Sequence, residues 1–443
     1  MIPSLLIANR GEIARRIIRT ARRLGIRTVA VYSEADAGMP FVLEADEAVA
    51  IGPANPALSY RNAEAILAAA KSSGAAAIHP GYGFLSENAD FARTVEENGL
   101  IWIGPGAEAI SAMGDKINAR NLMAAAGVPV AAGTPEPVVS ADAAVIAAAG
   151  IGYPVMVKAA AGGGGMGMGV AADEAALRTE FDKVRSFAER MFGDGSVLLE
   201  RYFPRVRHVE VQILGLADGR VIALSERECS VQRRNQKLVE EAPSPAVGPE
   251  LRERLLRAAA TAGEAVGYRN AGTVECLLDP ATGEFFFLEM NTRLQVEHPI
   301  TELIHGIDLV EQQLRIASGL APSFDPGSPE GHAIELRINA EDPKRFLPGP
   351  GKVATWVEPD GEGVRVDSGY AAGTTVTPFY DSLMAKLILF GADREEAIAR
   401  ARVAVSGFQI AGPKNNLPFF AELLANPEFL SGDYDTGIVA RMR

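Results

Sequence analysis

The first hundred residues alternate short apolar runs with amphipathic helical segments, and this alternation is the strongest constraint on the fold. Residues 4–8 have the pattern of a buried strand, apolar from Leu5 onward, and apolar side chains then recur at helical spacing as far as Leu24. A second predicted strand follows at 28–32, and the same order repeats to about residue 103. Because parallel strands need crossover helices, the pattern predicts a doubly wound α/β domain that ends near Met113.

Arginines are frequent in the first helical segment, at positions 15, 16, 19, 22 and 23. They fall mostly opposite the apolar side chains of that helix, so a solvated face is expected in preference to a nucleic-acid patch.

Length and composition narrow the class of protein. At roughly 150 residues per domain, a chain of 443 residues predicts two to four domains. A net charge of -13 argues against an extended nucleic-acid surface, and two cysteines are too few for a disulfide framework. The apolar windows are too short to span a bilayer, and the N-terminus lacks the apolar core of a signal peptide. We therefore expect a cytoplasmic protein that binds no nucleic acid and no membrane.

A loop at 79–88 follows the carboxyl end of a predicted strand, where open α/β sheets usually bind ligands. Tyr82 in this loop could line such a crevice. His79 could equally be a structural residue that caps the loop.

The central region contains a glycine-rich loop. Six of the eight residues at 162–169 are glycine, directly after a predicted strand that ends in Lys158. Without Cβ atoms, the backbone N–H groups of such a loop can surround phosphate oxygens. A flexible linker is the alternative, but the loop lies inside a predicted domain, which favours phosphate binding.

Polar residues follow the aromatic strand that begins at Phe285, at every second position: Glu289, Asn291, Arg293, Gln295 and Glu297. An extended chain would place these side chains on one side. Glu275 lies on the preceding predicted strand, and the turn at 279–284 would bring it close to Glu289. Two carboxylates and an amide oxygen suit a hard cation, and the arginine beyond them could hold an anion. The alternative is an ordinary strand with a polar outer face. We expect strand only to about Asn291 and a loop beyond it.

A new region begins near residue 331. Residues 335–342 alternate polar with apolar side chains, which places Arg337 on one face with Glu335 and Asn339. Further strands and two helices predict an α+β C-terminal domain.

With these pieces assembled, the chain resembles the biotin carboxylases, ATP-grasp enzymes of the biotin-dependent carboxylases. The similarity spans essentially the whole length and rests on several motifs in order: HPGYGFLSENA at 79–89, the glycine loop, RHVEVQ at 207–212, ERECSVQRRNQKLVEEAPSP at 226–245, EMNTRLQVEHPITE at 289–302, ELRINAEDP at 335–343 and PFYDSLMAKL at 378–387.

The resemblance implies a three-part ATP-grasp enzyme. Its parts are an N-terminal doubly wound domain at 1–113, a central ATP-grasp domain at 114–330 with a mobile glycine-loop lid at about 131–204, and a C-terminal α+β domain at 331–443.

The resemblance also implies the site residues. ATP contacts fall on Lys116, Lys158, Gly163, Gly164, Gly165, Glu200, His208, Gln232, Glu275 and Glu289. The metal ligands, expected to hold two Mg²⁺ or Mn²⁺ ions, are Glu275, Glu289 and Asn291. The bicarbonate site contains Lys237, Arg293, Gln295 and Val296, with Glu297 as the catalytic base. Tyr82 and Arg337 contact biotin, and Arg337 stabilises its enolate.

The implied chemistry begins with attack of bicarbonate on the γ-phosphoryl group of ATP. The resulting carboxyphosphate releases CO₂, which the biotin enolate captures. No Met-Lys-Met biotin-attachment motif is present, so biotin must arrive on another protein or as a free molecule. The implied partners are a biotin carboxyl carrier protein, a carboxyltransferase subunit of an enzyme such as acetyl-CoA carboxylase, and a second copy of the chain in a homodimer.

Four positions depart from the family pattern: Met166, Gly169, Arg201 and Asn235. Basic residues are common at the first two, Lys at the third and His at the fourth, so these changes bear on ATP affinity more than on reaction type. Two other functions stay open. One is an ATP-grasp ligase that joins a carboxylate to an amine, and the other is an ATP-binding regulatory subunit with weakened activity.

Overall fold

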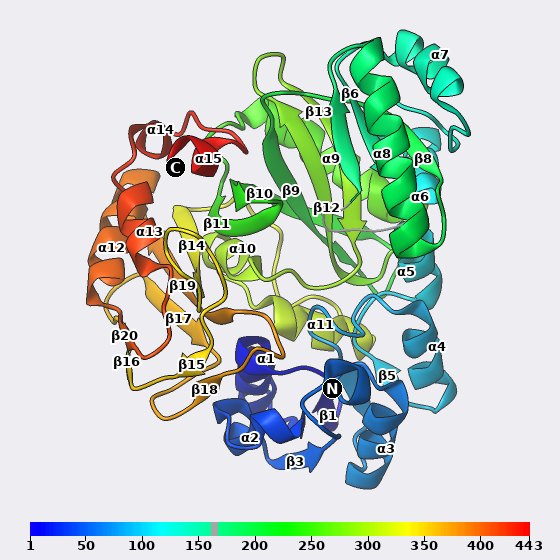
Figure 1. Ribbon diagram of the computed structural model, residues 1–443. Helices are drawn as coiled ribbons and strands as arrows, with labels where there is room; N and C mark the ends of the chain where they lie inside the picture. Colours follow the sequence, from blue (N-terminus) through cyan, green and yellow to red (C-terminus); the bar gives the residue numbers. More distant parts are fainter. Residues whose placement is uncertain (161–166) are drawn as a thin grey trace.

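The N-terminal part of the computed structural model is a parallel sheet with helices on both faces (Figure 1). The structure describes residues 1–160 and 167–443. The strand order is β3-β2-β1-β4-β5. The strands are β1 (Ser4–Ile7), β2 (Arg27–Tyr32), β3 (Glu47–Ala50), β4 (Ala77–His79) and β5 (Ile101–Trp102). The helices are α1 (Gly11–Arg23), α2 (Pro40–Glu44), α3 (Ala63–Ser73), α4 (Ala89–Glu97) and α5 (Ala107–Gly114). The predicted doubly wound fold is confirmed.

A small three-stranded sheet, β7-β6-β8, projects from the body of the molecule (Figure 1). It is antiparallel and has its own apolar core, built with the two helices that cover it. Helix α6 leads into it. Its elements are α6 (Lys116–Ala125), α7 (Ala141–Ile151), β6 (Val155–Ala159), β7 (Met168–Ala171), α8 (Glu174–Phe192) and β8 (Val197–Arg201). The long helix α8 was not predicted.

The largest sheet has eight strands in the order β13-β12-β9-β10-β11-β14-β19-β17. They are β9 (Arg207–Gly215), β10 (Val221–Arg233), β11 (Gln236–Ala242), β12 (Asn270–Asp279), β13 (Glu284–Asn291), β14 (His332–Asn339), β17 (Val364–Ser368) and β19 (Leu383–Gly391). Because β11 pairs with β14, this sheet continues across the expected domain boundary near residue 331. The boundaries themselves stay a prediction.

Helices flank this sheet, and two small ribbons complete the C-terminal region. The helices are α9 (Pro249–Ala265), α10 (His298–His305), α11 (Leu309–Ala317), α12 (Arg394–Gly407), α13 (Leu417–Leu423), α14 (Pro427–Ser431) and α15 (Ile438–Arg441). The ribbons pair β15 (Gly351–Lys352) with β18 (Thr375–Val376) and β16 (Thr355–Val357) with β20 (Gln409–Ala411). Among the described segments, none of the helices has both the length and the hydropathy needed to span a bilayer.

Arg16 corrects the expectation that the arginines of α1 lie on a solvated face. Its side chain is only 2% exposed, and its Nη2 atom lies 2.5 Å from Glu302 and 2.7 Å from Asp308. Arg23, at the far end of the same helix, is 53% exposed and does lie at the surface. The reason is tertiary: α1 packs against α11, so only part of its polar face meets water.

We predict that Arg16→Met destabilises the protein by about 3 kcal/mol, because it leaves the buried Glu302 carboxylate with less compensation. Arg23→Met, which removes an exposed partner of the same Asp308, should cost less than about 1 kcal/mol. Thermal unfolding of both variants checks this. Equal shifts in the two melting temperatures would show that the buried ion pairs of Arg16 do not contribute more to stability than the exposed one of Arg23.

Candidate functional site

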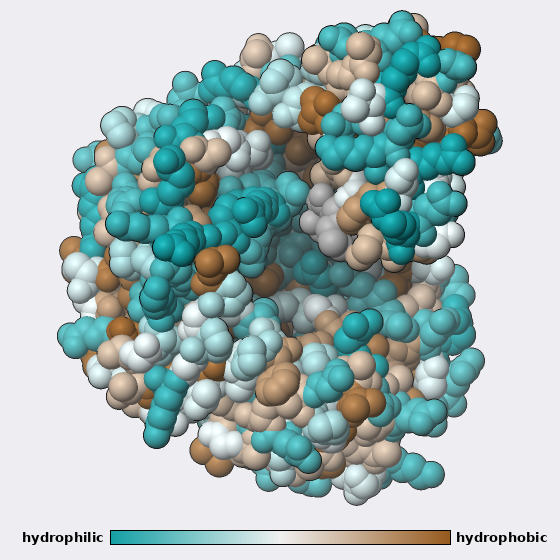
Figure 2. All heavy atoms as spheres, in the orientation of Figure 1, coloured by the Kyte–Doolittle hydropathy of each residue, from teal (hydrophilic) through white to brown (hydrophobic). Residues whose placement is uncertain are grey.

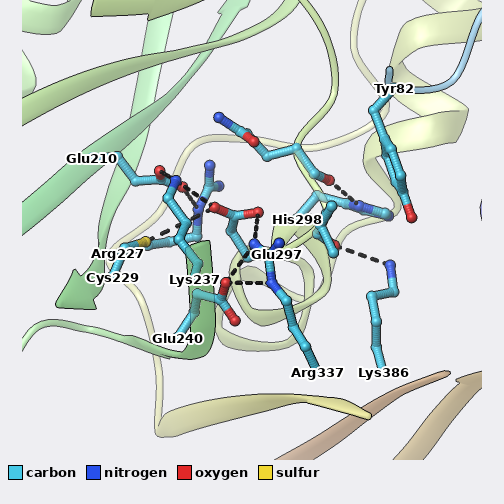
Figure 3. A network of polar contacts seen from close by, with 12 residues as sticks. Tyr82, Glu210, Arg227, Cys229, Lys237, Glu240, Glu297, His298, Arg337 and Lys386 are labelled. Carbon is cyan, nitrogen blue, oxygen red and sulfur yellow. Dashed lines mark hydrogen bonds and ion pairs between the residues drawn. The ribbon is translucent and has the colours of Figure 1, made fainter. Parts of the chain in front are cut away.

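Most of the predicted site residues lie on the large sheet and in the segment that follows β13. Figure 2 shows a deep hollow near the middle of the molecule, lined largely by hydrophilic residues. Figure 3 shows the polar network formed by Lys237, Glu297, Arg337 and their neighbours, which come from several strands and from the start of α10.

The metal-ligand candidates lie together on β12 and β13. Glu275 is directly opposite Glu289 in the antiparallel register, as the turn between the strands predicted. A bulge follows at once, because Cys276 is opposite Phe287 and Leu288 is the extra residue. The bulge explains how Phe285 and Phe287 face the apolar core while Glu289, at the same spacing, does not. Asn291 is the last residue of β13 and is buried.

This donor set fits a hard divalent cation, since it offers two carboxylates and an amide oxygen. Burial favours the neutral acid of Glu275, but Lys237 and His208 hold its pKa well below the usual range. Desolvation in the cleft and the charge of Glu275 raise the pKa of Glu289. The two opposed carboxylates therefore repel each other, and a bound Mg²⁺ or Mn²⁺ ion would relieve that repulsion.

Two residues predicted for the nucleotide pocket lie beside Glu275. His208 Nε2 is 3.0 Å from Glu275 Oε2. Gln232 Nε2 is 3.4 Å from His208 Nδ1 and so continues the same row of polar side chains across β9 and β10.

Lys237 is the cation at the centre of the network. Its Nζ atom donates to Glu210 at 2.5 Å, Glu275 at 2.8 Å and Glu297 at 2.7 Å. Burial alone would lower the pKa of Lys237, but the surrounding acidic groups raise it well above its usual value. Lys237 therefore stays charged and joins Glu275, a metal-ligand candidate, to Glu297. Figure 3 shows Lys237 beside Glu210 and Glu297.

Glu297 sits immediately before α10 and is fully buried. Its second oxygen accepts from Arg337 Nη2 at 2.9 Å. Burial works against its ionisation, yet Lys237 and Arg337 hold the pKa of Glu297 well below the usual range. The chain thus positions an ionised carboxylate between two cations. The segment between β13 and α10 is not part of a strand, which confirms the expected end of the strand at Asn291.

Arg293 links this loop to the N-terminal domain. Its Nε donates to Glu87 at 2.9 Å, and its two terminal nitrogens donate to Gln295 and Asn291, each at 2.9 Å. Gln295 in turn donates to Glu275 at 3.2 Å. The carbonyl of Val296 accepts from Lys386 Nζ at 3.0 Å, so the backbone of the predicted anion site is held in place.

The remaining predicted ATP contacts come from other elements. Lys158 and Glu200 form an ion pair on the three-stranded sheet, and Lys116 is an exposed residue at the start of α6. Gly163, Gly164 and Gly165 lie outside the described residues, as does Met166.

Tyr82 and His79 have distinct environments. The hydroxyl of Tyr82 donates to Glu12, and its ring lies on the same side of the network as Lys386 (Figure 3). His79 is fully buried between Gln313 and the backbone of Gly81, and burial lowers its pKa to about 3. Of the two roles that its sequence position allows, His79 therefore has the structural one.

Several polar residues of this network were not predicted. Glu210 anchors Lys237 and also accepts from the fully buried Arg227 at 2.5 Å. Glu240 accepts from Arg337 Nε at 2.7 Å, and Glu87 holds Arg293. The available signal was the presence of charged residues at alternate positions of apolar strands, as in RHVEVQ, where burial would force them to pair.

Two of the departures from the family pattern have local explanations. Asn235 has φ +64° in the turn between β10 and β11, a conformation that asparagine adopts more readily than histidine. Gly169 lies in β7, where an added Cβ would collide with the carboxylate of Glu180. A larger residue there would therefore require Glu180 to move.

Three family models match the chain in succession. The biotin carboxylase N-terminal domain matches residues 1–110, the ATP-binding domain of the carbamoyl-phosphate synthase L chain matches 115–322, and the biotin carboxylase C-terminal domain matches 335–441.

Relatives of known name match nearly the whole chain. Biotin carboxylase 2 of Bacillus subtilis is 50% identical over 438 residues, which are 98% of this chain and 98% of that protein. The biotin carboxylase of Haemophilus influenzae is 51% identical over 436 residues, which are 98% of this chain and 97% of that protein. A pyruvate carboxylase component of Methanothermobacter thermautotrophicus is 50% identical, over 100% of this chain and 90% of that protein.

Solved structures agree with this similarity. The biotin carboxylase–β,γ-ATP complex from Campylobacter jejuni superposes with a TM-score of 0.96 at 45% identity, covering 100% of this chain and 99% of that one. The biotin carboxylase domain dimer of Hydrogenobacter thermophilus 2-oxoglutarate carboxylase, solved with MgADP, ADP and bicarbonate, gives 0.94 at 44% identity, covering 100% and 98%.

We predict that Glu275→Gln and Glu289→Gln each weaken Mn²⁺ binding in the presence of ATP at least about tenfold, because each removes a charged oxygen ligand. Titration of free Mn²⁺ by electron paramagnetic resonance measures this. Glu284→Gln, an exposed residue on the same strand as Glu289, is the matched control and should bind Mn²⁺ as the unsubstituted chain does. Unchanged binding in the first two variants would remove these residues from the metal site.

Proposed function

The chain belongs to the biotin carboxylase family of ATP-dependent enzymes that carboxylate biotin, and from this premise we propose how its own residues perform the reaction. The observation that carries the proposal is the placement of Glu297. This buried carboxylate is held between the ammonium of Lys237 at 2.7 Å and the guanidinium of Arg337 at 2.9 Å, next to the metal-ligand candidates.

Bicarbonate binds, in this proposal, to Lys237, Arg293, Gln295 and the backbone of Val296. Glu297 takes its proton, which makes the attacking oxygen more nucleophilic. A depressed pKa suits this role, because Glu297 is ionised before bicarbonate arrives. The hydrogen bonds that join Arg293 to Gln295 and Asn291 support an anion site directly beside the metal-ligand candidates.

ATP supplies the phosphoryl group that bicarbonate attacks. We assign its contacts to Lys116, Lys158, Glu200, His208 and Gln232, together with Gly163, Gly164 and Gly165. A Mg²⁺ or Mn²⁺ ion bound by Glu275, Glu289 and Asn291 would neutralise charge on the ATP phosphates.

The second half of the reaction needs Arg337. Carboxyphosphate breaks down to CO₂ and phosphate, the phosphate takes the proton from biotin N1, and the resulting enolate attacks CO₂. The guanidinium of Arg337 stabilises the negative charge on the enolate oxygen, and Tyr82 contacts the biotin ring system. Because carboxyphosphate and the enolate react with water, closure of the lid over the site would preserve them.

The proposed partners are the proteins that would supply biotin and use carboxybiotin. We propose that biotin arrives on a separate carrier protein and that a carboxyltransferase uses carboxybiotin in an acyl-CoA carboxylase such as acetyl-CoA carboxylase. The names of relatives support a carboxyltransferase partner but differ in the acceptor, since they include a pyruvate carboxylase and a methylcrotonoyl-CoA carboxylase. We further propose a cytoplasmic homodimer, as the solved domain dimer suggests. Identification of the carboxyltransferase that co-purifies with the chain would show which molecule finally receives the carboxyl group.

We predict that the purified chain releases ADP from ATP in a reaction that requires bicarbonate and is stimulated by free biotin. Glu297→Gln should reduce this rate about 10²- to 10⁴-fold, the usual effect of losing a general base. Binding of ATP should change little, because Glu297 is not among the proposed nucleotide contacts.

Glu330→Gln serves as the control for this substitution, because Glu330 is exposed and lies outside the network. The activity of this variant should match that of the unsubstituted chain. Full activity of Glu297→Gln would contradict the assignment of the base. ADP release that does not depend on bicarbonate but requires an added amine would instead identify a ligase of another class.

A further inference from the structure

Behind Arg337 lies a second pair of acidic residues that the proposed reaction does not use. Glu240 on β11 and Glu335 on β14 are directly opposite each other in the antiparallel register, and both side chains are fully buried. Directly opposed residues have Cβ atoms about 5 Å apart, so two glutamate side chains at such positions can reach each other.

The hydrogen bonds of this pair are incomplete. Glu240 Oε1 accepts from Arg337, but Glu240 Oε2 and both oxygens of Glu335 have no hydrogen-bond partner among the residues that the structure describes. Buried polar atoms are rarely left unsatisfied. Two ionised carboxylates in this position would also repel each other without a cation between them.

Charged groups face the pair from four elements: Lys237 on β11, Arg337 on β14, Lys386 on β19 and Glu297 before α10. The two lysines are occupied elsewhere. Lys237 donates to three other carboxylates, and Lys386 donates to the carbonyl of Val296 and lies 3.2 Å from Glu12. Among the described residues, only Arg337 forms a hydrogen bond or ion pair with the side chains of this pair, and its partner is Glu240.

A single shared proton resolves both problems. A protonated Glu335 can donate to the unpartnered Glu240 Oε2, so that the pair carries one negative charge in place of two. The pKa values agree with this arrangement, because burial raises the pKa of Glu240 to about 7 and that of Glu335 well above its usual value. Two carboxyls that share a proton lose it as a pair, so neither has a separate titration.

The remaining charge on Glu240 orients Arg337. Glu240 Oε1 lies 2.7 Å from Nε and 2.5 Å from Nη2, while the same Nη2 donates to Glu297 at 2.9 Å (Figure 3). The guanidinium is thereby held on one edge by Glu240. Without that restraint it could turn to pair with both oxygens of Glu297, which would occupy the proposed base.

We propose that Glu240 is a positioning residue for Arg337 and that Glu335 is its protonated partner, the two carboxyls sharing one proton. This inference rests on the proposed function, because its effect is expressed in the biotin-dependent step. It adds two residues to the proposed site, and neither touches a substrate.

The test compares Glu240→Gln and Glu335→Gln in the full chain, with ADP release measured at saturating ATP and bicarbonate over a range of free biotin concentrations and pH values. Glu240→Gln should lower kcat for the biotin-dependent reaction about tenfold to a hundredfold, with KM for ATP within about twofold of the unsubstituted chain. Glu335→Gln resembles the protonated acid, so its loss of kcat at neutral pH should be about tenfold smaller than that of Glu240→Gln.

The pH dependence separates positioning from a purely structural role. As pH rises, the unsubstituted pair loses its shared proton and gains a second negative charge beside Arg337, whereas Glu335→Gln cannot. The rate of Glu335→Gln relative to the unsubstituted chain should therefore rise with pH. Glu241→Gln is the matched control: it removes the next buried acid on β11, which pairs with His332 and Arg394, and should lower the melting temperature without this pH trend.

The outcomes are distinct. If the unsubstituted chain shows no biotin-stimulated ADP release, the proposed function fails first. If the unsubstituted chain is active and Glu240→Gln has the same kcat, the positioning role is overturned. If the rate of Glu335→Gln relative to the unsubstituted chain does not change with pH, the shared proton is overturned. Should Glu240→Gln not fold, Glu240→Asp keeps the charge but shortens the side chain, and it must still lower kcat for biotin; full activity would overturn the proposal.

Discussion

The contact on which this site most depends is the one between the ammonium of Lys237 and three carboxylates. Glu210, Glu275 and Glu297 all lie within 2.8 Å of a single nitrogen, and all three are buried. Without Lys237, Glu275 and Glu297 would each lose the cation that does most to lower their pKa, and burial would favour their neutral acids. Lys237 therefore stabilises the charged forms of Glu275, a metal-ligand candidate, and Glu297, the proposed base.

The sheet makes this arrangement possible by continuing across what the sequence suggests are two domains. β11 pairs with β14, so Arg337 from the C-terminal region is in register beside the strand that carries Lys237 and Glu240. The N-terminal domain contributes through Glu87, which holds Arg293 from the other side of the loop. Side chains far apart in sequence are thus fixed by backbone pairing and by short ion pairs.

Local signals in the sequence were sufficient for part of this picture. The turn between β12 and β13 predicted that Glu275 and Glu289 would be opposed, and the expected change from strand to loop after Asn291 is confirmed. The alternation of strands and helices predicted the parallel sheet. The family resemblance, carried by several long motifs, identified Lys237 and Arg337, which local patterns alone did not distinguish from surface charges.

Other features could not be predicted because tertiary pairing decides them. Arg16 has the same spacing as its exposed neighbours, and only the packing of α1 on α11 makes it buried. In the sequence, nothing distinguishes three other acids from the polar face of an ordinary strand: Glu210, Glu240 and Glu335. They are buried only because helices and loops cover both sides of the sheet. Burial then turns each of them from a solvated charge into a group that must be paired or neutralised.

The central claim is that bicarbonate itself, activated in the anion site beside Glu297, attacks ATP. Turnover with bicarbonate labelled with ¹⁸O, followed by mass spectrometry of the released phosphate, tests it most directly. The account predicts one ¹⁸O atom transferred from bicarbonate to each phosphate formed in the biotin-dependent reaction. Phosphate that carries oxygen from water and none from bicarbonate would contradict it.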